Sequence, residues 1–534
     1  MAGTSFVSGL ASGLDWRNII DQLRRLENKK VDLINQKKKE YGEKVTAWQE
    51  INKKLLSLKT KAEELNSSQG FGLFKSILTS NSTTKPEEIL SATAGEEASA
   101  GIYQIVVHQL ARAQKYASQG FASQTSPLNF EGELLINGKS LVVSPTDSLL
   151  TIRNKINALN TGADPSKVTA TLLHYGGQGY RLVLTSDLEG AAGMSLLNGA
   201  SGNLMGALGL TEIQSGADAH LSVDGIALFV PSNAVRDVIP GVILNLKKAQ
   251  ADTTVTVKIE RDHLAIKEKI KELVKAYNEV VEAIQTQFTY DAEKEKTGGP
   301  LFGDSGLRSI RAGLSQLILN PIPGAQEAFS TLGMIGINLD QQGKLKIDES
   351  KLQDHLETHF DDVRRLFAFQ WTSTSSHLTY IHHSRETKPG TYSIRITGLN
   401  PVAGYFVEPG DAIGEGEYLK GISGDAKGLV VRYSGQTTGT IGTVTLSFGV
   451  AELLQRTLHQ MTDSLGGLIA AKTRGLEETM ARMDKDIAQM ELRINRRMEE
   501  LERQFITMET ALSRLQSQTN WLASQIRNLN RNWQ

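Results

Sequence analysis

The apolar residues of the C-terminal stretch, residues 476–533, follow the spacing of a helix with one apolar side. They recur at alternating steps of four and three, with one irregular step at Met498 and no Pro or Gly among them: Leu476, Met480, Met483, Ile487, Met490, Ile494, Leu501, Phe505, Met508, Leu512, Leu515, Leu522, Ile526 and Leu529. At about 1.5 Å per residue, such a helix is roughly 80 Å long. It cannot bury its apolar stripe against itself, so the pattern predicts a partner helix. We expect this final helix to begin near Gly449.

A second long helical pattern covers residues 19–65, with Gly42 as its one weak position. Its apolar residues are Ile20, Leu23, Leu26, Leu33, Ile34, Tyr41, Val45, Trp48, Leu55, Leu58, Ala62 and Leu65. Because each terminal helix needs a partner, the simplest arrangement pairs the two as a stalk. The middle of the chain is then an insertion at one end of that stalk.

The residues after Ser67 change from helical spacing to alternation, which is typical of strands. Two hairpins are predicted, around Asn137-Gly138 and Asp224-Gly225, because these dipeptides suit two-residue turns with positive φ. A short helix is expected at 148–159, and further strands are expected at 103–107, 168–173, 180–185 and 255–259. This region therefore predicts a β-rich head, with two small subdomains.

Helical spacing returns at 263–288, and two more helices are predicted at 305–319 and 349–367, with a small strand pair (335–339 and 344–347) between them. Residues 370–448 are β-like again and rich in Gly and Thr. The segment GTYSIRITGL (390–399) shares Gly, Tyr, Ile and Leu with GIYQIVVHQL (101–110) at matching places. This weak repeat suggests two β insertions of related design.

These patterns predict an α+β multidomain fold, in which long N- and C-terminal helices pair as a coiled-coil stalk that carries inserted β-rich head domains. Five regions are expected: an N-terminal helical leg and stalk (1–75), the β-rich head (76–262), a helical stalk segment with a small strand pair (263–369), an additional β insertion (370–448) and a C-terminal coiled-coil helix and leg (449–534).

Composition narrows the possible functions of this 534-residue chain. A formal net charge of −1 argues against a bulk electrostatic partner such as nucleic acid or an anionic membrane. The absence of cysteine excludes disulfides, thiol catalysis and Cys-ligated zinc. No stretch approaches eighteen apolar residues, so no membrane span is expected, and the N-terminus lacks a signal-peptide pattern. A cytoplasmic protein and one exported without a cleaved leader both fit these observations.

No catalytic, cofactor-binding or metal-binding set is predicted. His355 and His359 are four apart on a helix, but the intervening Glu is misplaced for a metalloprotease pattern, so a solvated helix face is favoured over zinc. For His377, His382 and His383, which lie in a polar stretch, we expect a loop. The glycines of 176–179 lie between two strands, which favours a hairpin turn over a phosphate-binding loop.

Several segments together resemble the flagellar filament cap family, also called flagellar hook-associated protein 2 or FliD. The segment GLASGLDWRNIIDQLRRLE (9–27) resembles the N-terminal motif of that family, and AGIYQIVVHQLARAQ (100–114) looks like the segment that follows. The segment LGMIGINLDQQGKLKIDESKL (332–352) resembles its C-terminal half. The head segment TLLHYGGQGYRLVLTS (171–186) is similar to a repeat that flagellin-like proteins carry as an insertion. The order and spacing of these segments match the family over nearly the whole chain.

The resemblance implies a non-enzymatic, structural protein of bacterial motility. Family members are secreted through the flagellar export channel and form a ring-shaped homo-oligomer at the distal tip of the extracellular filament. Their head domains make a plate, and their terminal helices act as legs. Flagellin folds and inserts beneath the plate during filament elongation. The implied partners are further copies of the chain, flagellin, the hook–filament junction proteins, an export chaperone and the export apparatus. In some pathogens the head also contributes to cell adhesion, so an adhesin that binds host glycan or mucin is the alternative function.

The polar residues of the last helix suggest how a leg would bind. After Thr510 the chain contains no Asp or Glu, and uncharged polar groups cost less to bury in a polymer than carboxylates. This end would become ordered when packed, whereas the alternative is a coiled coil that is always formed. The residues expected to contact other copies or the filament lie on both terminal helices: Ile20, Leu23, Leu26, Leu501, Phe505, Leu512, Leu515, Leu522, Ile526 and Leu529.

Overall fold

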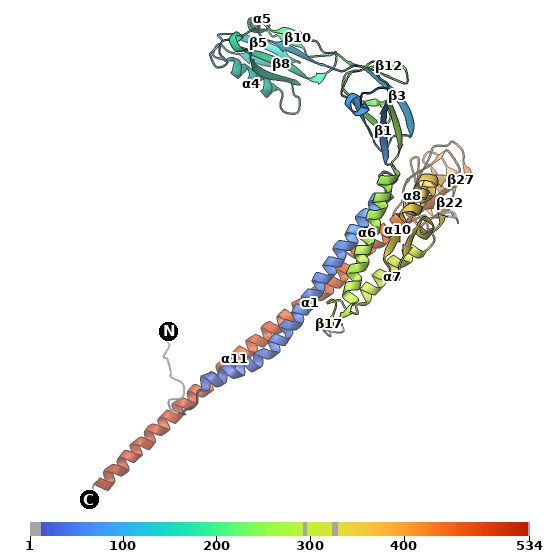
Figure 1. The fold of residues 1–534 in the computed structure, drawn as a ribbon. Helices are drawn as coiled ribbons and strands as arrows, with labels where there is room; N and C mark the ends of the chain where they lie inside the picture. The colour runs from blue at the N-terminus through green and yellow to red at the C-terminus, as the bar shows by residue number, and fades with distance from the viewer. Residues whose placement is uncertain (1–11, 292–295, 323–328, 409, 532–534) are drawn as a thin grey trace. The chain divides into compact units, whose positions relative to one another are not determined.

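A computed structural model of the protein describes residues 12–291, 296–322, 329–408 and 410–531 (Figure 1). The chain divides into two compact units. The first, here called the stalk unit, combines Met1–Ser67 with Glu268–Gln534, and the second, the head unit, is Ser68–Lys267. The head unit is thus inserted between the two parts of the stalk unit, and each unit has its own cores.

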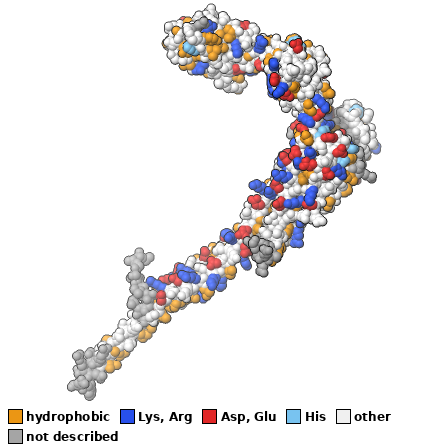
Figure 2. All heavy atoms as spheres, viewed as in Figure 1, with side chains coloured by type: hydrophobic (Ala, Val, Ile, Leu, Met, Phe, Trp, Pro, Cys, Tyr) orange, Lys and Arg blue, Asp and Glu red, His pale blue; other side chains and the backbone are white. Residues whose placement is uncertain are grey.

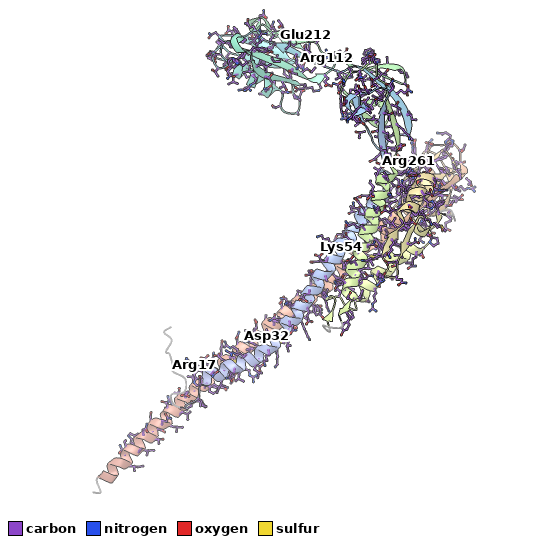
Figure 3. The ribbon with its side chains drawn as sticks, viewed as in Figure 1. Arg17, Asp32, Lys54, Arg112, Glu212 and Arg261 are labelled. Atoms are coloured by element: carbon purple, nitrogen blue, oxygen red, sulfur yellow. The ribbon has the colours of Figure 1, made fainter. Side chains whose placement is uncertain are left out.

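The stalk unit is built on two long helices, α1 (Trp16–Asn66) and α11 (Leu468–Arg531), which lie side by side (Figure 1). Asp15 begins α1 as its N-cap, because its carboxylate accepts a hydrogen bond from the backbone N–H of Asn18. Two ion pairs, Lys38–Asp484 and Glu27–Arg497, show that the helices run antiparallel. The predicted α+β fold with a paired helical stalk is confirmed. Figure 3 labels Arg17, Asp32 and Lys54, which lie in that order along α1.

The prediction of one final helix from Gly449 is wrong. Two helices occupy this region, α10 (Val450–Thr462) and α11, separated by five residues. A Cβ on Gly467 would come within 2.6 Å of backbone atoms of Asp463, so the turn requires glycine there. The Asp463 carboxylate also accepts a hydrogen bond from the backbone N–H of Gly466. The Gly466-Gly467 pair therefore belongs to the turn that leads from the end of α10 to the start of α11.

The C-terminal half of α1 packs into a helical bundle instead of a two-helix coil. Its apolar residues Ile51, Leu55, Leu58, Ala62 and Leu65 are all at most 2% exposed. The other helices of this bundle are α6 (His263–Phe288), α7 (Ser305–Leu319) and α10. Lysines of α1 form ion pairs with glutamates of α6, Lys54 with Glu279 at 2.8 Å and Lys61 with Glu272 at 2.7 Å.

Short elements follow α6 and α7. They are β16 (Tyr290–Asp291), β17 (Lys296–Thr297), η3 (Leu332–Ile335), β18 (Ile337–Leu339), β19 (Leu345–Ile347), α8 (Glu349–Thr358) and α9 (Phe360–Phe367). The predicted strand pair is present as β18 and β19.

The single helix predicted over 349–367 is wrong, because His359 adopts φ −133° and ends α8 before α9 begins. This break turns the aromatic face of α9 into the core, where Phe360 and Phe367 are buried.

Residues 370–447 form a separate β insertion within the stalk unit. Its strands are β20 (Gln370–Ser373), β21 (Leu378–His382), β22 (Gly390–Gly398), β23 (Ala403–Tyr405), β24 (Ala412–Glu415), β25 (Tyr418–Gly421), β26 (Val430–Tyr433) and β27 (Gly439–Ser447). They make two four-stranded antiparallel sheets, ordered β20-β27-β22-β23 and β21-β26-β25-β24. The sheets enclose one core that includes Tyr392, Phe406, Tyr433 and Phe448.

The head unit contains two hydrophobic cores. The first lies between a five-stranded sheet ordered β1-β15-β3-β11-β12 and a three-stranded sheet ordered β13-β14-β2. These strands are β1 (Phe74–Ser80), β2 (Leu90–Ala94), β3 (Gly101–Gln109), β11 (Ala219–Val223), β12 (Ile226–Val230), β13 (Ala234–Ile239), β14 (Val242–Leu246) and β15 (Val255–Arg261). Two single-turn helices, α2 (Ser68–Phe71) and α3 (Pro86–Ile89), flank β1.

The second core of the head unit is formed by residues between β3 and β11. Its elements are β4 (Ala113–Ala117), β5 (Gly132–Ile136), β6 (Lys139–Val143), α4 (Leu149–Leu159), β7 (Val168–His174), η1 (Gly176–Gln178), β8 (Tyr180–Glu189), β9 (Leu196–Asn198), α5 (Leu204–Leu208) and β10 (Thr211–Gln214). They form sheets ordered β10-β4-β8-β7 and β6-β5-β9. The glycines of 176–179 connect β7 to β8, as the hairpin interpretation predicted.

The two predicted hairpin turns are confirmed by their backbone angles. Asn137 and Gly138 have φ of 47° and 80°, and Asp224 and Gly225 have φ of 49° and 82°. Positive φ at both central residues is what the Asn-Gly and Asp-Gly dipeptides favour. The similar segments 101–110 and 390–399 both form inner strands, β3 and β22, of antiparallel sheets. Each pairs with the last strand of its β region, β3 with β15 and β22 with β27.

Candidate assembly surface

The part of α11 beside α1 buries its apolar stripe in the stalk. The buried residues here are Trp16, Ile20, Val31, Ile494 and Met498, and Leu501 and Phe505 pack against them. The ring of Trp16 stacks on that of Phe505, with centroids 5.9 Å apart. Three predicted site residues, Ile20, Leu501 and Phe505, therefore come together inside the stalk.

The irregular step at Met498 lies at the centre of this contact. Met498 is 1% exposed and is the most buried residue of the cluster. The step from Ile494 to Met498 is four residues where three is expected, while Ile494 and Leu501 stay seven residues apart. The seven-residue repeat is therefore kept, and only one of its two apolar positions shifts by one residue. A long, unbranched Met fits the uneven space that results.

Two other predicted residues of α1 point away from α11. Leu23 is 37% exposed and Leu26 is 59% exposed, and their neighbours on the same side, Ile19 and Leu33, are 39% and 60% exposed. The structure therefore separates the apolar residues of α1 into two stripes. One stripe faces α11, and the other faces solvent.

The remaining predicted residues lie on the part of α11 that runs past the start of α1, here called the distal end (residues 510–531). Leu512 is half-buried, whereas Leu515, Leu522 and Ile526 are 58%, 53% and 57% exposed. Leu529 belongs to α11, but its side chain lies outside the part that the structure describes. Sequence reasoning missed Trp521, which is 61% exposed on the same helix.

The distal end also differs from the rest of the stalk in its charges. The last carboxylate of the chain is that of Glu509, and the charged residues that follow are Arg514, Arg527 and Arg531. In Figure 2, blue and red side chains cover the stalk beside α1, whereas orange and white predominate towards the distal end. An exposed apolar stripe between uncharged polar side chains is a surface suited to burial against another protein.

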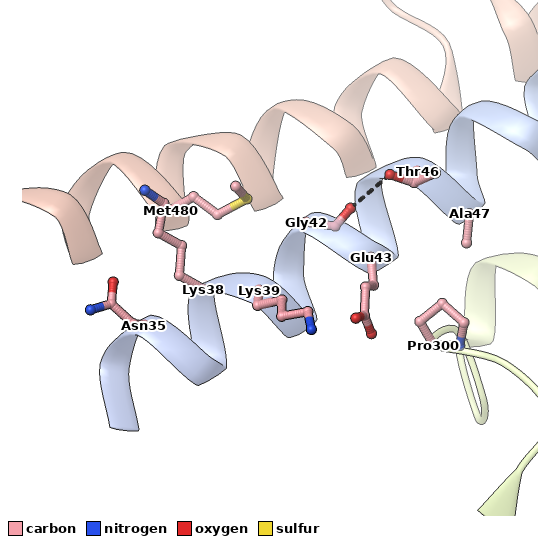
Figure 4. A pocket seen from close by; sticks show the side chains of 9 residues that line it. All are labelled: Asn35, Lys38, Lys39, Gly42, Glu43, Thr46, Ala47, Pro300 and Met480. Carbon is pink, nitrogen blue, oxygen red and sulfur yellow. Dashed lines mark hydrogen bonds between the residues drawn. The ribbon is translucent and has the colours of Figure 1, made fainter. Parts of the chain in front are cut away.

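Two grooves lie between α1 and α11. The larger one (Figure 4) is lined by Asn35, Lys38, Lys39, Gly42, Glu43, Thr46, Ala47, Pro300 and Met480. The smaller one is lined by Glu27, Lys30, Met490, Arg493, Ile494 and Arg497. Each is an open channel along two helices, and neither lining includes a histidine or a pair of facing carboxylates.

The prediction that His355 lies on a solvated helix face is wrong. Its ring is half-buried, and its centroid lies 5.4 Å from that of Phe329. His359 is exposed and lies 5.0 Å from the same phenyl ring. These rings cap the end of α8. Within the described ranges, no three His, Asp or Glu side chains are grouped closely enough to hold a metal ion.

The loop predicted at His377, His382 and His383 is wrong only for His382, because His377 lies in a turn and His383 follows the end of the strand. His382 ends strand β21, and His383 is largely buried between Phe369 and Phe448. The Nδ1 atom of His383 lies 2.6 Å from the Tyr380 hydroxyl, and its Nε2 atom lies 3.3 Å from Oε1 of Glu452 on α10. The sequence could not indicate this contact, because His383 and Glu452 are 69 residues apart.

Glu452 is the centre of a buried polar network that joins three elements. Arg456 donates through Nε to its Oε1, and Asn66, at the end of α1, donates to its Oε2 at 2.6 Å. The Arg456 guanidinium also donates to the carbonyl oxygens of Ser384, Arg385 and Thr387 and lies 4.1 Å from the centroid of Phe448. These bonds fasten the β insertion to the helical bundle.

The electrostatics of this network fit a structural role. Burial disfavours the charged form of Glu452, but the hydrogen bonds from His383 and Arg456 outweigh it and hold its pKa at about 2. Burial raises the pKa of Tyr380 to about 12, and the negative charge of Glu452 adds to this effect. At neutral pH the carboxylate is therefore ionised and fully bonded, and the phenol is neutral. Neither group is poised to exchange protons.

The geometry defines a class of protein before any comparison. The stalk is a helix pair, in which one apolar stripe of α1 is buried and the other is exposed. Its distal end exposes apolar side chains and has no Asp or Glu, and the chain contains β-rich insertions. No helix in the described part of the chain is both long and apolar enough to cross a membrane. These features are those of a protein that assembles with other chains.

Comparison with known families identifies the chain more closely. The family profile described as "Flagellar hook-associated protein 2 C-terminus" matches residues 216–517, and that described as "Flagellar hook-associated protein 2 N-terminus" matches residues 12–114. Because the first match alone covers more than half of the sequence, the chain belongs to the flagellar hook-associated protein 2 family.

Individual relatives agree with this assignment. The A-type flagellar hook-associated protein 2 of Pseudomonas aeruginosa is 28% identical over 400 residues, which are 69% of this chain and 81% of that protein. Flagellar hook-associated protein 2 of Xenorhabdus nematophila is 28% identical over 448 residues, covering 73% and 88% of the two chains. The crystal structure of the D1-D2-D3 domains of the flagellar cap protein FliD from Escherichia coli shares the fold. It has a TM-score of 0.54 at 21% identity, covering 81% of this chain and 99% of that one. The names of these relatives refer to the flagellum and give no support to the adhesin alternative.

Proposed function

We propose that this chain is a non-enzymatic structural protein that caps the distal end of the bacterial flagellar filament as a ring-shaped homo-oligomer. It would promote the folding and insertion of flagellin at the tip during elongation. Its membership of the flagellar hook-associated protein 2 family supports the flagellar location. On this proposal its partners are other copies of the chain, flagellin and the hook–filament junction proteins. An export chaperone and the export channel deliver it to the outside of the cell.

The observation that carries this proposal is the distal end of α11. Three leucine and isoleucine side chains there, Leu515, Leu522 and Ile526, are each more than half exposed. Burying one such side chain stabilises a complex by about 1.5–3 kcal/mol, so burial against the filament would supply a large gain. The absence of carboxylates after Glu509 removes the groups that would cost most to bury. Leu512 and Leu529 belong to the same stripe and are assigned to the same contact.

The five regions of the chain then have separate roles. Residues 1–75 and 449–534 supply the stalk and the leg, residues 76–262 supply the head, residues 263–369 brace the stalk, and residues 370–448 enlarge the outer part. Ile20, Leu501 and Phe505 hold the stalk together from inside. Leu23 and Leu26 are left for contact with other chains.

A truncation after Thr510 tests the proposal. The paired part of the stalk, from Trp16 to Phe505, stays in the truncated chain, so its fold and its oligomers should persist. Cells that make only the truncated chain should export flagellin without building filaments, measured by electron microscopy and by flagellin in the medium. Filaments of normal length would overturn the assignment of the distal end.

A point variant separates lost apolar contact from lost length. Replacing Leu515, Leu522 and Ile526 together with glutamine should reproduce the truncation. The matched control replaces three exposed polar residues of the same segment, Gln518, Asn520 and Gln525, with alanine and should leave filament growth unchanged. Equal loss in both variants would show that the helix is needed only as a spacer.

A further inference from the structure

The exposed stripe of α1, here called the second seam, has the spacing of a surface that packs against another helix. Positions 19, 23, 26, 30, 33 and 37 follow steps of four and three, and they hold four apolar residues and two lysines: Ile19, Leu23, Leu26, Lys30, Leu33 and Lys37. The apolar members are 37–60% exposed, and the side chain of Lys30 is 72% exposed. This is the surface that α1 would present to a second helix, and α11 does not cover it.

The surface continues across the stalk as a basic groove. The smaller groove between α1 and α11 lies beside Lys30, and its charged residues are Lys30, Arg493, Arg497 and Glu27. Glu27 is paired with Arg497 at 2.9 Å and with Lys30 at 3.4 Å. The lining holds three cations and one carboxylate, so the groove keeps a positive charge. A helix with carboxylates on its face fits this side of the stalk.

The opposite side of the stalk carries such carboxylates. An α-helix turns by about 100° per residue, and α1 and α11 run antiparallel. This geometry places Asp32 of α1 and Glu491 of α11 on the side away from the basic groove. Both side chains are exposed. By the same count Asp21, Asp484 and Glu502 lie along this side, but so do Arg25 and Lys39 of α1, so most of its net negative charge comes from α11.

The acidic and basic sides also match in height along the stalk. The groove is formed by residues 490–497 of α11, and Glu491 and Asn495 of that helix lie at the same level on the acidic side. Copies in a cyclic ring are related by rotation alone, without a shift along the axis, so equal levels meet when the stalks follow the axis. A contact between different faces of neighbouring copies is the kind that closes into a ring.

We propose that the stalks pack side by side in the assembled oligomer, with the basic groove and second seam of one copy receiving the acidic side of the next. Lys30 and Arg493 of one copy face Asp32 and Glu491 of its neighbour, and Leu26 and Leu33 are buried in the contact. This inference rests on the proposed ring-shaped homo-oligomer and adds the surface through which the stalks associate. Flagellin is the competing occupant of the same stripe.

Charge reversal on each side tests the proposal with purified full-length protein. The variant Lys30→Glu/Arg493→Glu has two acidic sides, and Asp32→Lys/Glu491→Lys has two basic sides. Each alone should need about tenfold or more higher concentration to form the oligomer, measured by mass photometry, because like charges then meet. An equimolar mixture should assemble at lower concentration than either variant alone, since complementary sides alternate at every contact of an even-numbered ring and at all but one contact of an odd-numbered ring. Recovery on mixing also shows that both variants are folded.

The matched control is Lys29→Glu/Arg496→Glu, which makes the same change in net charge on exposed neighbouring positions of the same two helices. It should assemble as the unaltered chain does. Reversal variants that assemble normally by themselves, or a mixture that assembles no better than either variant alone, would overturn the proposal. Because this readout needs no flagellin, such a result leaves the proposed cap function standing. The truncation after Thr510 tests that function separately.

A cross-linker identifies the occupant directly. The chain has no cysteine, so Leu26→Cys provides a single attachment point for a photoreactive group. In the oligomer, and on filaments, the label should be found on residues of the acidic side of another copy, near Asp32 or Glu491. Labelling of flagellin instead would assign this stripe to the filament and contradict the proposal.

Discussion

The apolar residues of α11 follow one spacing in two parts of the helix. Beside α1 they are covered by α1, whereas on the distal end, which runs past α1, they are exposed. Beside α1, Ile494 and Met498 are at most 9% exposed. On the distal end, Leu515 and Leu522 are more than half exposed. The spacing alone predicts that each part needs a partner. The polar residues between the apolar ones indicate whether that partner belongs to the same chain or to another molecule.

Charges are the difference between the two parts. Beside α1, α11 carries carboxylates that are satisfied within the chain or by water, as in the pair Asp484–Lys38. The distal end has none. A helix that stays in water tolerates carboxylates, whereas one that becomes buried must desolvate them at a large cost. On the proposed function, the comparison separates a permanent contact from one that forms on assembly.

The largest expected effect is at the base of the paired part. Trp16→Ala removes a 2%-exposed indole that stacks on Phe505 and should destabilise the pairing of α1 with α11 by about 4 kcal/mol. A chain with several cores does not unfold in one step, so the local measure is hydrogen exchange of the α1 amides. Unchanged protection of residues 16–34 would show that the stalk does not depend on this stack.

A second prediction concerns the buried carboxylate of Glu452, which is hydrogen-bonded by His383, Arg456 and Asn66 of the same chain. Glu452 has a pKa of about 2 in the folded chain, compared with 4.5 for an ordinary glutamate. Because the folded pKa is depressed, the stabilisation is complete above about pH 4.5 and is lost as the pH falls towards 2. It amounts to about 3 kcal/mol. In the Glu452→Gln variant, thermal unfolding of the β insertion should lose this pH dependence. Hydrogen exchange of the strands of the insertion is the measurement.

A control for that experiment is available on the surface of the same insertion. Glu417 is 60% exposed at its side chain and pairs with Arg432 at 2.8 Å. An exposed pair contributes little, so Glu417→Gln should leave the acid unfolding of the insertion nearly unchanged. Equal shifts of the acid unfolding in Glu452→Gln and Glu417→Gln would mean that burial of Glu452 does not increase its contribution to stability.

A smaller, stabilising effect is expected at Gly42. This residue lies inside α1, and the nearest atom to an added Cβ is the methyl carbon of Met480 at 3.9 Å. Gly42→Ala should therefore stabilise α1 by about 0.5–1 kcal/mol, because alanine restricts the unfolded chain and fits the space. Slower exchange of amides around residue 42 would be the confirming result. Faster exchange would mean that the groove above Gly42 must stay open.

The smallest effect on stability is expected at the distal end. Leu522→Ala should change the stability of the isolated protein by less than about 0.5 kcal/mol, because the side chain is already 53% exposed. The same variant should weaken retention of the protein on filaments, scored by pelleting caps with sheared filaments. A stability loss comparable to that of Trp16→Ala would abolish the distinction between the two parts of α11.

The long helices and the tight hairpins could be predicted from the sequence because their causes are local. Four-three spacing specifies α1 and α11, and Asn137-Gly138 specifies a turn by its φ preference. The break between α10 and α11 was also visible as Gly466-Gly467, but the strength of the helical pattern on both sides concealed it. The division of 349–367 at His359 has no such local signal, because tertiary packing of Phe360 and Phe367 determines it.

The burial of His383 and the two-sided character of α1 could not be predicted in the same way. The pairing of His383 with Glu452 depends on a contact between distant segments. The residues of both stripes of α1 are visible in the sequence, but a helical pattern does not say which stripe a partner covers. Only the structure shows that Ile20 faces α11 and that Leu26 does not.

In each of the two β-rich insertions the chain enters and leaves at neighbouring positions, and this affects how the protein can evolve. The first and last strands of each are paired neighbours, with Phe74 opposite Arg261 in one and Gln370 opposite Ser447 in the other. Paired strands are about 5 Å apart, so a short turn could close the gap left by removing either insertion. Genetic exchange can therefore replace, enlarge or delete these outer modules while the helices keep their register. On the proposed function, the outer modules are then free to diverge, whereas the helices that contact the filament are not.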